Sequence, residues 1–410
     1  MKLPNCRHCG SKLAHKFLDL GHAPPSNGYL SPADLNAPEL TYPLRLRVCD
    51  ECLLVQTEDF MESESLFSSE YAYYSSTSRS WLDRSEQYCR MAAKRFGLNS
   101  KSFVIEVASN DGYLLRNFVA AGIPCLGIEP AANTARAAED RGIPVLQEFF
   151  CEKLGRRLAS EKHKADLIVG NNVYAHVPDI NDFTRGLAAV LKPEGTITLE
   201  FPHLKRLVED CLFDTVYHEH FSYISFICAQ RILRTHGLRI FDVEELPTHG
   251  GSLRIYCCHI GASRQTTIAV QNILDGELTC GMNEIAFYEG FQSRADAVKH
   301  RLLEFLLEAK RGGKKVAGYG AAAKGNTLLN YSGIKPDLLP FVCDAAPSKQ
   351  GKLLPGSHIP ILKPSELIEF APDFVLVLAW NLLEEVKSQY LCLSRMGTRF
   401  VIAVPKVQIC

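Results

Sequence analysis

The chain has 410 residues, a length that predicts two or three domains rather than a single core. Hydrophobic residues make up 46% and charged residues 22%, which is typical of a soluble globular protein. The formal net charge of −1 disfavours binding to nucleic acid or to an anionic membrane. The longest apolar run, Asp373 to Trp380, is too short to span a bilayer, and MKLPNCRHCG lacks the apolar part of a secretory signal. Fifteen cysteines, an odd and mostly scattered set, predict reduced thiols in a cytoplasmic protein.

Four cysteines near the N-terminus form two pairs with metal-ligand spacing. Cys6 and Cys9 enclose two residues in CRHC, and Cys49 and Cys52 do the same in CDEC. Two such knuckles predict a tetrahedral Zn²⁺ held by four thiolates, with no open coordination position and hence a structural role. The long separation between the knuckles predicts a small subdomain that includes the turn-rich strip LGHAPPSNGYL. His8 and His22 are less favoured alternative ligands, and two unrelated thiol pairs are the plain alternative.

The middle of the chain predicts a strand, a glycine turn and a helix. FVIEVASNDG begins as an apolar strand at Phe103 and ends in Asp111 and Gly112, and a helical segment follows. The glycine allows a ligand to approach the backbone at the carboxyl end of the strand. The next strand, CLGIEP, ends in Glu129, an acidic side chain placed as in proteins that hold two ribose hydroxyls. A later buried strand ends at Asn171-Asn172, and GTITLEFPH supplies another.

This order of features resembles the class I S-adenosylmethionine-dependent methyltransferases. The resemblance implies that Glu129 binds the ribose and that the turn from Ala108 to Gly112 lies near the methionine part of the cofactor. It also implies that Phe149-Phe150 and Asn171 are neighbours of the cofactor. A solvated carboxylate at the strand end is the alternative for Glu129. The expected cofactor-binding set is Glu106, Ala108, Ser109, Asn110, Asp111, Gly112, Glu129, Phe149 and Asn171.

The segment YHEHFSY, residues 217–223, concentrates two histidines, a carboxylate and two phenols. On a strand His218 and His220 would share a face and could chelate a metal. They do not have the spacing of H-E-x-x-H on a helix, which disfavours a metalloprotease. A hydrogen-bonded histidine cluster that closes a core is a further interpretation.

Five motifs occur in a specific order: CxxC…CxxC, EVASNDGYLL, YHEHFSY, HGGSLR and GYGAAAKGNTLLN. Together, over essentially the whole chain, they resemble the sugar C-methyltransferases that add a branching methyl group to nucleotide-linked keto-deoxysugars. A new carbon–carbon bond requires a carbanion equivalent, which loss of a proton next to a ketone supplies as an enolate. That step needs a base with a suitable pKa, usually histidine, and a donor near the developing oxyanion.

His220 is the predicted base, and Glu219 is close enough to influence its tautomer and charge. The resemblance implies that Tyr217 and His176 contact the sugar or polarise its ketone. It also implicates a tyrosine of SEYAYYSS, for which Tyr71 fits best and Tyr73 or Tyr74 could serve instead. Ordinary packing is the alternative for His176 and Tyr71.

The C-terminal third predicts a helical segment over about 260–312 and then a second, smaller Rossmann-like lobe. GYGAAAKG supplies a glycine turn, and further strands end at Asp344 and in DFVLVLAWN. A helix N-terminus with a lysine suits a pyrophosphate. A glycine turn that only allows tight strand–helix packing is the alternative. The predicted residues for binding the nucleotide sugar are Gly320, Lys324 and Asn326.

The sequence therefore predicts an α/β chain with three parts. These are a zinc-binding domain at 1–65, a methyltransferase domain at 66–258, and a helical segment with a Rossmann-like lobe at 259–410. The predicted activity is transfer of a methyl group from S-adenosylmethionine to C3 of a nucleoside-diphosphate 4-keto-6-deoxysugar for branched deoxysugar synthesis, and the length permits a monomer. The motifs leave open the nucleotide, the C3 substituent, the stereochemistry and the final product.

Three other functions are compatible with parts of the sequence. The same architecture could methylate oxygen or nitrogen of a sugar, although YHEH favours carbon because heteroatoms need less activation. An NAD-dependent sugar-nucleotide dehydrogenase or epimerase would use the C-terminal lobe and would not need EVASNDG. A zinc-ribbon module with a degenerate methyltransferase lobe would need a basic face for nucleic acid, which the net charge disfavours.

Overall fold

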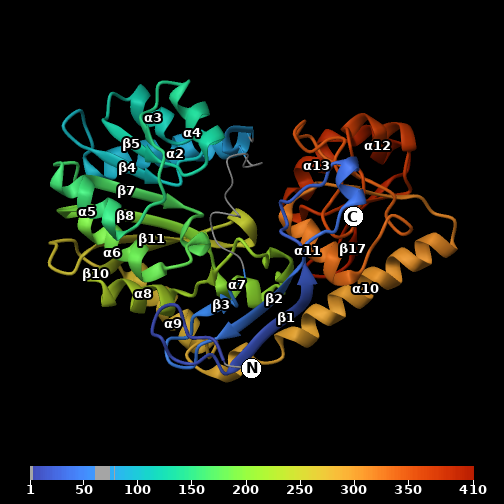
Figure 1. Cartoon of the computed structure of the whole chain (residues 1–410), viewed down its shortest axis with the longest axis horizontal. Coiled ribbons are helices and arrows are strands. Elements are labelled where there is room, and N and C mark those ends of the chain that lie inside the picture. Colours follow the sequence, from blue (N-terminus) through green and yellow to red (C-terminus); the bar gives the residue numbers. More distant parts are fainter. Residues whose placement is uncertain (1–2, 61–73, 78) are drawn as a thin grey trace.

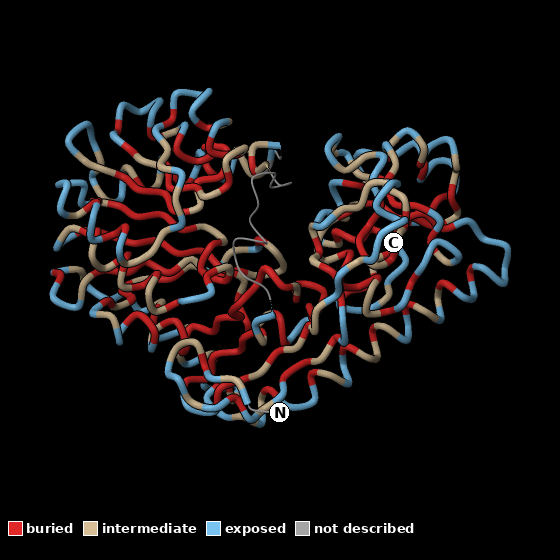
Figure 2. The backbone as a smooth tube through the Cα atoms, viewed as in Figure 1, coloured by how far each residue is buried: buried red, intermediate tan, exposed pale blue. Residues whose placement is uncertain are grey.

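The computed structural model describes residues 3–60, 74–77 and 79–410; for residue 80 it describes the backbone alone. Within these residues, three sheets organise the chain (Figure 1). The methyltransferase-like lobe and the C-terminal lobe lie on opposite sides of the view, and the N-terminal sheet lies below and between them. Buried backbone runs through both lobes and through the base that joins them (Figure 2).

The first sheet is four-stranded and has the order β1-β2-β3-β9. Its strands are β1 (His15–Ala23), β2 (Tyr42–Val48), β3 (Val55–Thr57) and β9 (Ser222–Tyr223). The last strand comes directly after the YHEHF sequence and pairs with β3. The N-terminal sheet therefore fixes one end of the histidine-rich loop.

The second sheet is seven-stranded, in the order β10-β11-β8-β7-β4-β5-β6. Its strands are β4 (Val104–Val107), β5 (Cys125–Ile128), β6 (Val145–Leu146), β7 (Ala165–Asn171), β8 (Leu191–Pro202), β10 (Leu238–Leu246) and β11 (Ser252–His259). The strands from β6 to β8 are parallel, whereas β11 is antiparallel to both of its neighbours. The chain order reverses between β4 and β7, which places a ligand-binding crevice at the carboxyl ends of these strands.

Helices cover both faces of this sheet because successive strand residues point to opposite sides. In β4, Val104 packs in one core cluster with side chains of α2 and α3, and Ile105 packs in another with those of α5, α6 and α8. The helices are α2 (Arg79–Phe96), α3 (Leu115–Ala120), α4 (Ala132–Glu139), α5 (Glu152–Ser160), α6 (Ile180–Val190), α7 (Leu204–Glu209) and α8 (Phe226–Thr235). Short 3-10 turns include η2 (Ser75–Thr77), η3 (Tyr174–His176), η4 (Phe213–Thr215) and η5 (Thr248–Gly250).

The third sheet has six strands, in the order β14-β13-β12-β15-β16-β17, with only β17 antiparallel. The strands are β12 (Val316–Tyr319), β13 (Val342–Cys343), β14 (Ile361–Leu362), β15 (Phe374–Val377), β16 (Arg399–Ile402) and β17 (Gln408–Ile409). The helices of this part are α9 (Ile268–Thr279), α10 (Phe291–Arg311), α11 (Ala323–Ser332), α12 (Pro364–Phe370), α13 (Leu383–Gln389) and α14 (Leu391–Arg395). The remaining 3-10 turns are η1 (Pro32–Asn36), η6 (Ile285–Tyr288) and η7 (Trp380–Leu382).

The predicted α/β class and the Rossmann-like character of both lobes are confirmed. The helical segment ends as predicted, since α10 stops at Arg311 and Gly312 caps it. The YHEH sequence does not form the strand on which His218 and His220 would share a face. A turn runs through it, and within YHEHFSY only Ser222–Tyr223 pair with the sheet. The predicted domain boundaries stay predictions, and β9 shows that the middle segment also contributes to the N-terminal sheet. No helix in the described part of the chain is long and apolar enough to span a membrane.

Candidate active site and zinc centre

The four predicted cysteine ligands come together at one point. In Cys6, Cys9, Cys49 and Cys52, the sulfur atoms all lie within 4.8 Å of one another. A tetrahedral zinc with Zn–S bonds of ~2.3 Å needs sulfurs roughly 3.8 Å apart, so the donor set fits Zn²⁺. The Gln56 amide donates a hydrogen bond of 3.2 Å to Cys6 Sγ. Neither His8 nor His22 belongs to this group among the described residues.

The turn after β4 has an unusual backbone. Ala108 (φ 58°) and Asn110 (φ 50°) adopt the left-handed region together with Gly112 (φ 75°). Each non-glycine residue in this region costs about 1–3 kcal/mol, and such costs concentrate at functional sites. Because Gly112 has no side chain, Ile143 can pack against it, where an added Cβ would meet Ile143 Cδ1 at 2.2 Å. The turn thus bends tightly around the end of β4.

Glu129 lies at the end of β5 and closes this turn. Its Oε2 accepts a hydrogen bond of 2.9 Å from the Asn110 amide, and its Oε1 accepts one of 3.0 Å from the Ala131 amide. Burial raises the pKa of the Glu129 carboxyl, and the two amide donors oppose that shift. Each oxygen keeps a second lone pair, so the carboxylate can also accept hydrogen bonds from a diol.

One cavity of about 410 Å³ connects this turn with the histidine-rich loop and the C-terminal lobe. Of the predicted cofactor-binding residues, Ala108, Asn110, Glu129, Phe149 and Asn171 line it. The buried Oδ1 atoms of Asn171 and Asn172, both in the cavity wall, have no hydrogen-bond partner among the described residues. These acceptors, the Glu129 carboxylate and the aromatic wall fit S-adenosylmethionine.

The other predicted cofactor-binding residues lie behind the cavity wall. Asp111 forms an ion pair of 3.0 Å with Arg141, and Ser109 packs against Gly127. Glu106 is buried under the turn, and burial raises the pKa of its carboxyl well above the ordinary value. Glu106, Ser109, Asp111 and Gly112 therefore shape the turn, and their direct contact with a cofactor stays a prediction.

The histidine-rich loop enters the same cavity through His220. Its Nδ1 lies 2.9 Å from the carbonyl oxygen of Thr215, to which a protonated Nδ1 donates. This contact leaves Nε2 as the acceptor nitrogen of the neutral ring. Burial holds the pKa of His220 well below the ordinary histidine value, and His176, His249 and Lys324 reinforce the shift. The ring is therefore neutral at physiological pH.

Two further predicted residues surround the His220 ring. The Tyr217 ring centroid lies 4.0 Å away, and the His176 centroid lies 4.6 Å away in an edge-on arrangement. Burial lowers the pKa of His176 to about 4, while its hydrogen bond to the Glu219 carbonyl opposes this shift. Both residues line the cavity. His218, by contrast, points to the Pro43 carbonyl, 3.3 Å from its Nε2, so the two histidines of HEH do not share a site.

Glu219 also lines the cavity, with only 3% of its surface exposed. The Asn27 amide donates a hydrogen bond of 2.7 Å to its Oε1. Burial raises the pKa of the Glu219 carboxyl to about 7, and the Asn27 donor acts against that rise. Tyr71 and Tyr73 lie outside the described residues. The Tyr74 hydroxyl accepts a hydrogen bond of 3.0 Å from the Asn133 amide.

The C-terminal lobe contributes Lys324 to the cavity wall. Its ammonium donates a hydrogen bond of 2.8 Å to Asn381 Oδ1 and lies 4.4 Å from the Trp380 ring centroid. Burial lowers the pKa of Lys324, and Asp214 opposes the shift. The other two predicted residues do not line the cavity: Asn326 donates to the Ser26 carbonyl across 2.6 Å, and Gly320 packs against Ala379.

Sequence reasoning missed several cavity residues. Asn27 and Lys349 approach from loops that carry no chemical motif, and Trp81 comes from the start of α2. His249 could have been found, because it begins the HGGSLR motif that was singled out without a role for its histidine. It adopts the left-handed region with φ 55°, and burial, Lys324 and Arg84 lower its pKa to about 4.

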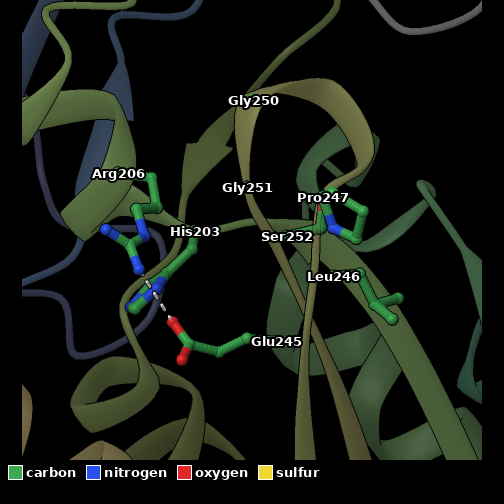
Figure 3. A pocket seen from close by; sticks show the side chains of 8 residues that line it. All are labelled: His203, Arg206, Glu245, Leu246, Pro247, Gly250, Gly251 and Ser252. Atoms are coloured by element: carbon green, nitrogen blue, oxygen red, sulfur yellow. Dashed lines mark hydrogen bonds and ion pairs between the residues drawn. The ribbon is translucent and has the colours of Figure 1, made fainter.

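A second cavity of about 380 Å³ is lined in part by Pro247, Gly250 and Gly251, which flank His249 in the sequence (Figure 3). Arg206 and Glu245 are paired across it, 3.3 Å apart. The buried His203 in its wall pairs with Glu277 at 2.6 Å. The charges of the Arg206 guanidinium and the Glu245 carboxylate thus offset one another. Its lining residues are His203, Arg206, Glu245, Leu246, Pro247, Gly250, Gly251 and Ser252.

Known proteins and protein families resemble this chain over most of its length. Three family models match: a "Putative zinc binding domain" over 6–67, a "Methyltransferase domain" over 80–243 and a "C-methyltransferase C-terminal domain" over 247–405. The C-methyltransferase NovU of Streptomyces niveus is 33% identical over 407 residues, which cover 99% of this chain and 97% of NovU. The predicted S-adenosylmethionine cofactor and structural zinc are thereby confirmed at the level of fold and domain.

Two solved structures show more distant similarity. An S-adenosylmethionine-dependent methyltransferase from Clostridium acetobutylicum is 11% identical with a TM-score of 0.36, covering 44% of this chain and 92% of its own. The magnesium protoporphyrin IX methyltransferase of Synechocystis, with S-adenosylmethionine bound, is 14% identical with a TM-score of 0.34, covering 43% of this chain and 79% of its own.

Proposed function

The chain belongs to the S-adenosylmethionine-dependent C-methyltransferases, and on that premise we propose that it methylates C3 of a nucleoside-diphosphate 4-keto-6-deoxysugar. The observation that carries the proposal is the placement of His220. A neutral histidine, with Nδ1 engaged by Thr215, lines the same cavity as the turn expected to hold the methyl donor. The ordered motifs of the sequence support the sugar substrate.

His220 acts as the general base at Nε2. The Thr215 carbonyl selects the tautomer in which Nε2 carries a lone pair, and burial keeps the ring uncharged. The C3–H bond breaks, the proton moves to Nε2, and the electron pair forms the C3=C4 bond of an enolate. S-adenosylmethionine, held by the residues at the strand ends, would supply an electrophilic methyl group. As C3 gains the new C–C bond and the C4 carbonyl re-forms, the S–CH3 bond would break and its electron pair would remain on the sulfur of the departing S-adenosylhomocysteine.

The cofactor is held by residues at the carboxyl ends of the parallel strands. Glu129 accepts hydrogen bonds from the two ribose hydroxyls. The turn at Ala108 and Asn110 brings backbone groups close to the methionine part of the cofactor. Asn171 offers its Oδ1, which has no partner among the described residues, to a donor such as the cofactor ammonium. Phe149 supplies an apolar surface in the same wall.

The developing charge on the C4 oxygen needs a donor. Tyr217 and Glu219 line the cavity beside His220, and a protonated Glu219 carboxyl can donate. His176 has its ring hydrogen-bonded to the Glu219 carbonyl, which orients both the loop and the imidazole edge next to His220. Tyr71 remains a proposed contact with the sugar from outside the described residues.

The C-terminal lobe binds the diphosphate of the substrate. Lys324 and the backbone at Ala322 and Ala323, at the N-terminus of α11, line the cavity, and this combination of positive charge and N–H groups suits a pyrophosphate. Gly320 and Asn326 support this site by fixing the turn and the docking of α11.

The function is tested with purified enzyme, S-adenosylmethionine and a panel of dTDP- and GDP-linked 4-keto-6-deoxysugars in D₂O, followed by mass spectrometry. We expect one added methyl group on a keto-sugar together with exchange of the α-proton. Methylation of oxygen or nitrogen without α-proton loss would contradict carbon methylation. The absence of both methylation and exchange across the panel would overturn the proposed substrate class.

A further inference from the structure

A strip of the N-terminal domain, residues 24–30, forms part of the seam between the two lobes. The Ser26 carbonyl accepts a hydrogen bond of 2.6 Å from Asn326, and the Tyr29 hydroxyl donates one of 2.7 Å to the Ala321 carbonyl. Leu30 and Leu353 exchange two backbone hydrogen bonds of 3.0 and 2.8 Å. The strip is therefore held on both sides of Asn27.

Asn27 is the residue of this strip that lines the cavity. Its Nδ2 donates a hydrogen bond of 2.7 Å to Glu219 Oε1. Within the described part of the chain, Glu219 Oε2 has no hydrogen-bond partner. The two oxygens of this buried carboxyl group consequently have different surroundings, one facing a fixed donor and the other unengaged.

We propose that Asn27 is a positioning residue that determines which oxygen of Glu219 carries the proton, so that Glu219 donates from Oε2 to the substrate ketone. An amide N–H can only donate, and the carbonyl oxygen of a carboxylic acid accepts more strongly than its hydroxyl oxygen, so the Asn27 donor favours the form with the carbonyl at Oε1 and the proton on Oε2. The N-terminal domain thereby contributes directly to the chemistry of the cavity. The donation step rests on the proposed function, whereas control of the Glu219 proton does not.

The ionisation of Glu219 lies in a useful range for this role. Burial raises its pKa to about 7, so neutral and charged forms coexist near physiological pH. The Asn27 hydrogen bond stabilises the carboxylate and acts against this rise. Among the described residues, the titratable groups around the cavity and the strip are Tyr29, Tyr113, Glu129, His176, Tyr217, His220, His249, Lys324, Asp344 and Lys349.

The proton of Glu219 can be followed without substrate. The C=O stretch of the protonated Glu219 carboxyl group is recorded by infrared spectroscopy while the intact protein is titrated with pH. The spectrum of Glu219→Gln at the same pH is subtracted to isolate this band. We expect the midpoint to rise by roughly one pH unit in Asn27→Ala, because the donor that stabilises the carboxylate is lost. Asn27→Asp should raise it further, since a second carboxylate then faces Glu219. An unchanged midpoint in Asn27→Ala would overturn the inference.

The matched control is Asn330→Ala. The Asn330 amide donates to the Pro355 carbonyl across 3.1 Å within the C-terminal lobe, beside Gly356, which Pro24 of the strip also approaches, and it does not line the cavity. Its loss should leave the Glu219 midpoint in place. A shift of equal size in this control would show that loosening the packing next to the strip, rather than loss of the Asn27 amide, changes the pKa of the carboxyl group, and would also overturn the inference.

The pH dependence of α-proton exchange then tests the donation step. Because the donating form of Glu219 is protonated, the rate should fall as the pH rises through its pKa, and Asn27→Ala should move this fall to higher pH. An infrared shift without a change in the kinetic limb would refute donation by Glu219. An infrared shift in a protein that neither methylates nor exchanges any sugar would support control by Asn27 and refute the proposed function instead.

Discussion

The indole N–H of Trp380 donates a hydrogen bond of 2.7 Å to Asp214 Oδ2, which ties the C-terminal lobe to the segment that leads into the histidine-rich loop. Thr327 adds a second tie by donating to the Val216 carbonyl across 2.7 Å. The Thr215 carbonyl that orients His220 lies between these two anchors. The C-terminal lobe therefore positions the proposed base in addition to its proposed role in binding substrate.

Trp380→Phe keeps an aromatic ring but removes the donor to buried Asp214. Leaving a buried acceptor unpaired costs about 1–3 kcal/mol of stability, and the loop that carries His220 loses one anchor. We expect a lower Tm and a larger loss in kcat for α-proton exchange than in S-adenosylmethionine affinity. Tyr390→Phe, which removes a 3.3 Å contact with Tyr319 inside the lobe, is the control and should retain kcat. Equal kcat values for wild type and Trp380→Phe would contradict this role.

His220→Asn should abolish methyl transfer and α-proton exchange while S-adenosylmethionine still binds. A general base contributes ~10²–10⁴-fold to the rate, and asparagine offers no basic nitrogen. His218→Asn is the matched control, because His218 faces the Pro43 carbonyl and does not line the cavity. Exchange rates by NMR and cofactor affinity by calorimetry check the prediction. Exchange at the wild-type rate in His220→Asn would remove this residue from the mechanism.

The acid side of the pH profile should reflect the lowered pKa of His220. The base must be unprotonated, and burial together with nearby cationic groups disfavours its protonation, so activity should persist well below pH 6.5. Lys324→Ala removes one positive neighbour, which raises the His220 pKa and moves the acid limb to higher pH. Initial rates of α-proton exchange across the acidic range measure the acid limb of the wild type and that of Lys324→Ala. A half-maximal wild-type rate near the ordinary histidine pKa of about 6.5 would contradict the prediction.

Lys324→Ala should also raise KM for the nucleotide sugar, because a cation in the cavity wall is lost. A charge-assisted hydrogen bond contributes about 1.5–3 kcal/mol, equivalent to a roughly 10- to 100-fold rise in KM. The KM for S-adenosylmethionine should change little. Lys310→Ala, whose side chain pairs with Asp337 on the surface, is the control. An unchanged sugar KM in Lys324→Ala would argue against the phosphate contact.

Purified protein should contain one zinc ion per chain, and Cys49→Ser should lose it. Because a closed four-thiolate site contributes directly to folding, the variant should have a lower Tm. It should also lose activity, since the strip with Asn27 belongs to the same domain. The exposed Cys280 provides a neutral control as Cys280→Ser. Elemental analysis that finds clearly less than stoichiometric zinc in fresh wild-type protein would refute the structural site.

The sequence by itself determined the features that depend on local pattern. Apolar runs and turn glycines located the main strands, including β4, β7 and β12, because alternation and turn chemistry are encoded by neighbouring residues. The two CxxC knuckles determined the metal ligands, since only the ligand type and spacing mattered. His220 and Glu129, which both line the cavity, could be singled out because a motif places each at an expected point of the fold.

Only the tertiary structure decided how segments far apart in sequence share one cavity. Asn27 and Glu219 meet because the N-terminal strip passes between the lobes, and no local signal records that path. The same is true of Trp380 and Asp214. His218 and His220 are neighbours in sequence, yet a turn directs them to different partners, so the environment alone distinguishes a structural histidine from the proposed base. Burial sets the charge state of His220. It results from packing of segments that lie far apart in the sequence, and no single motif encodes it.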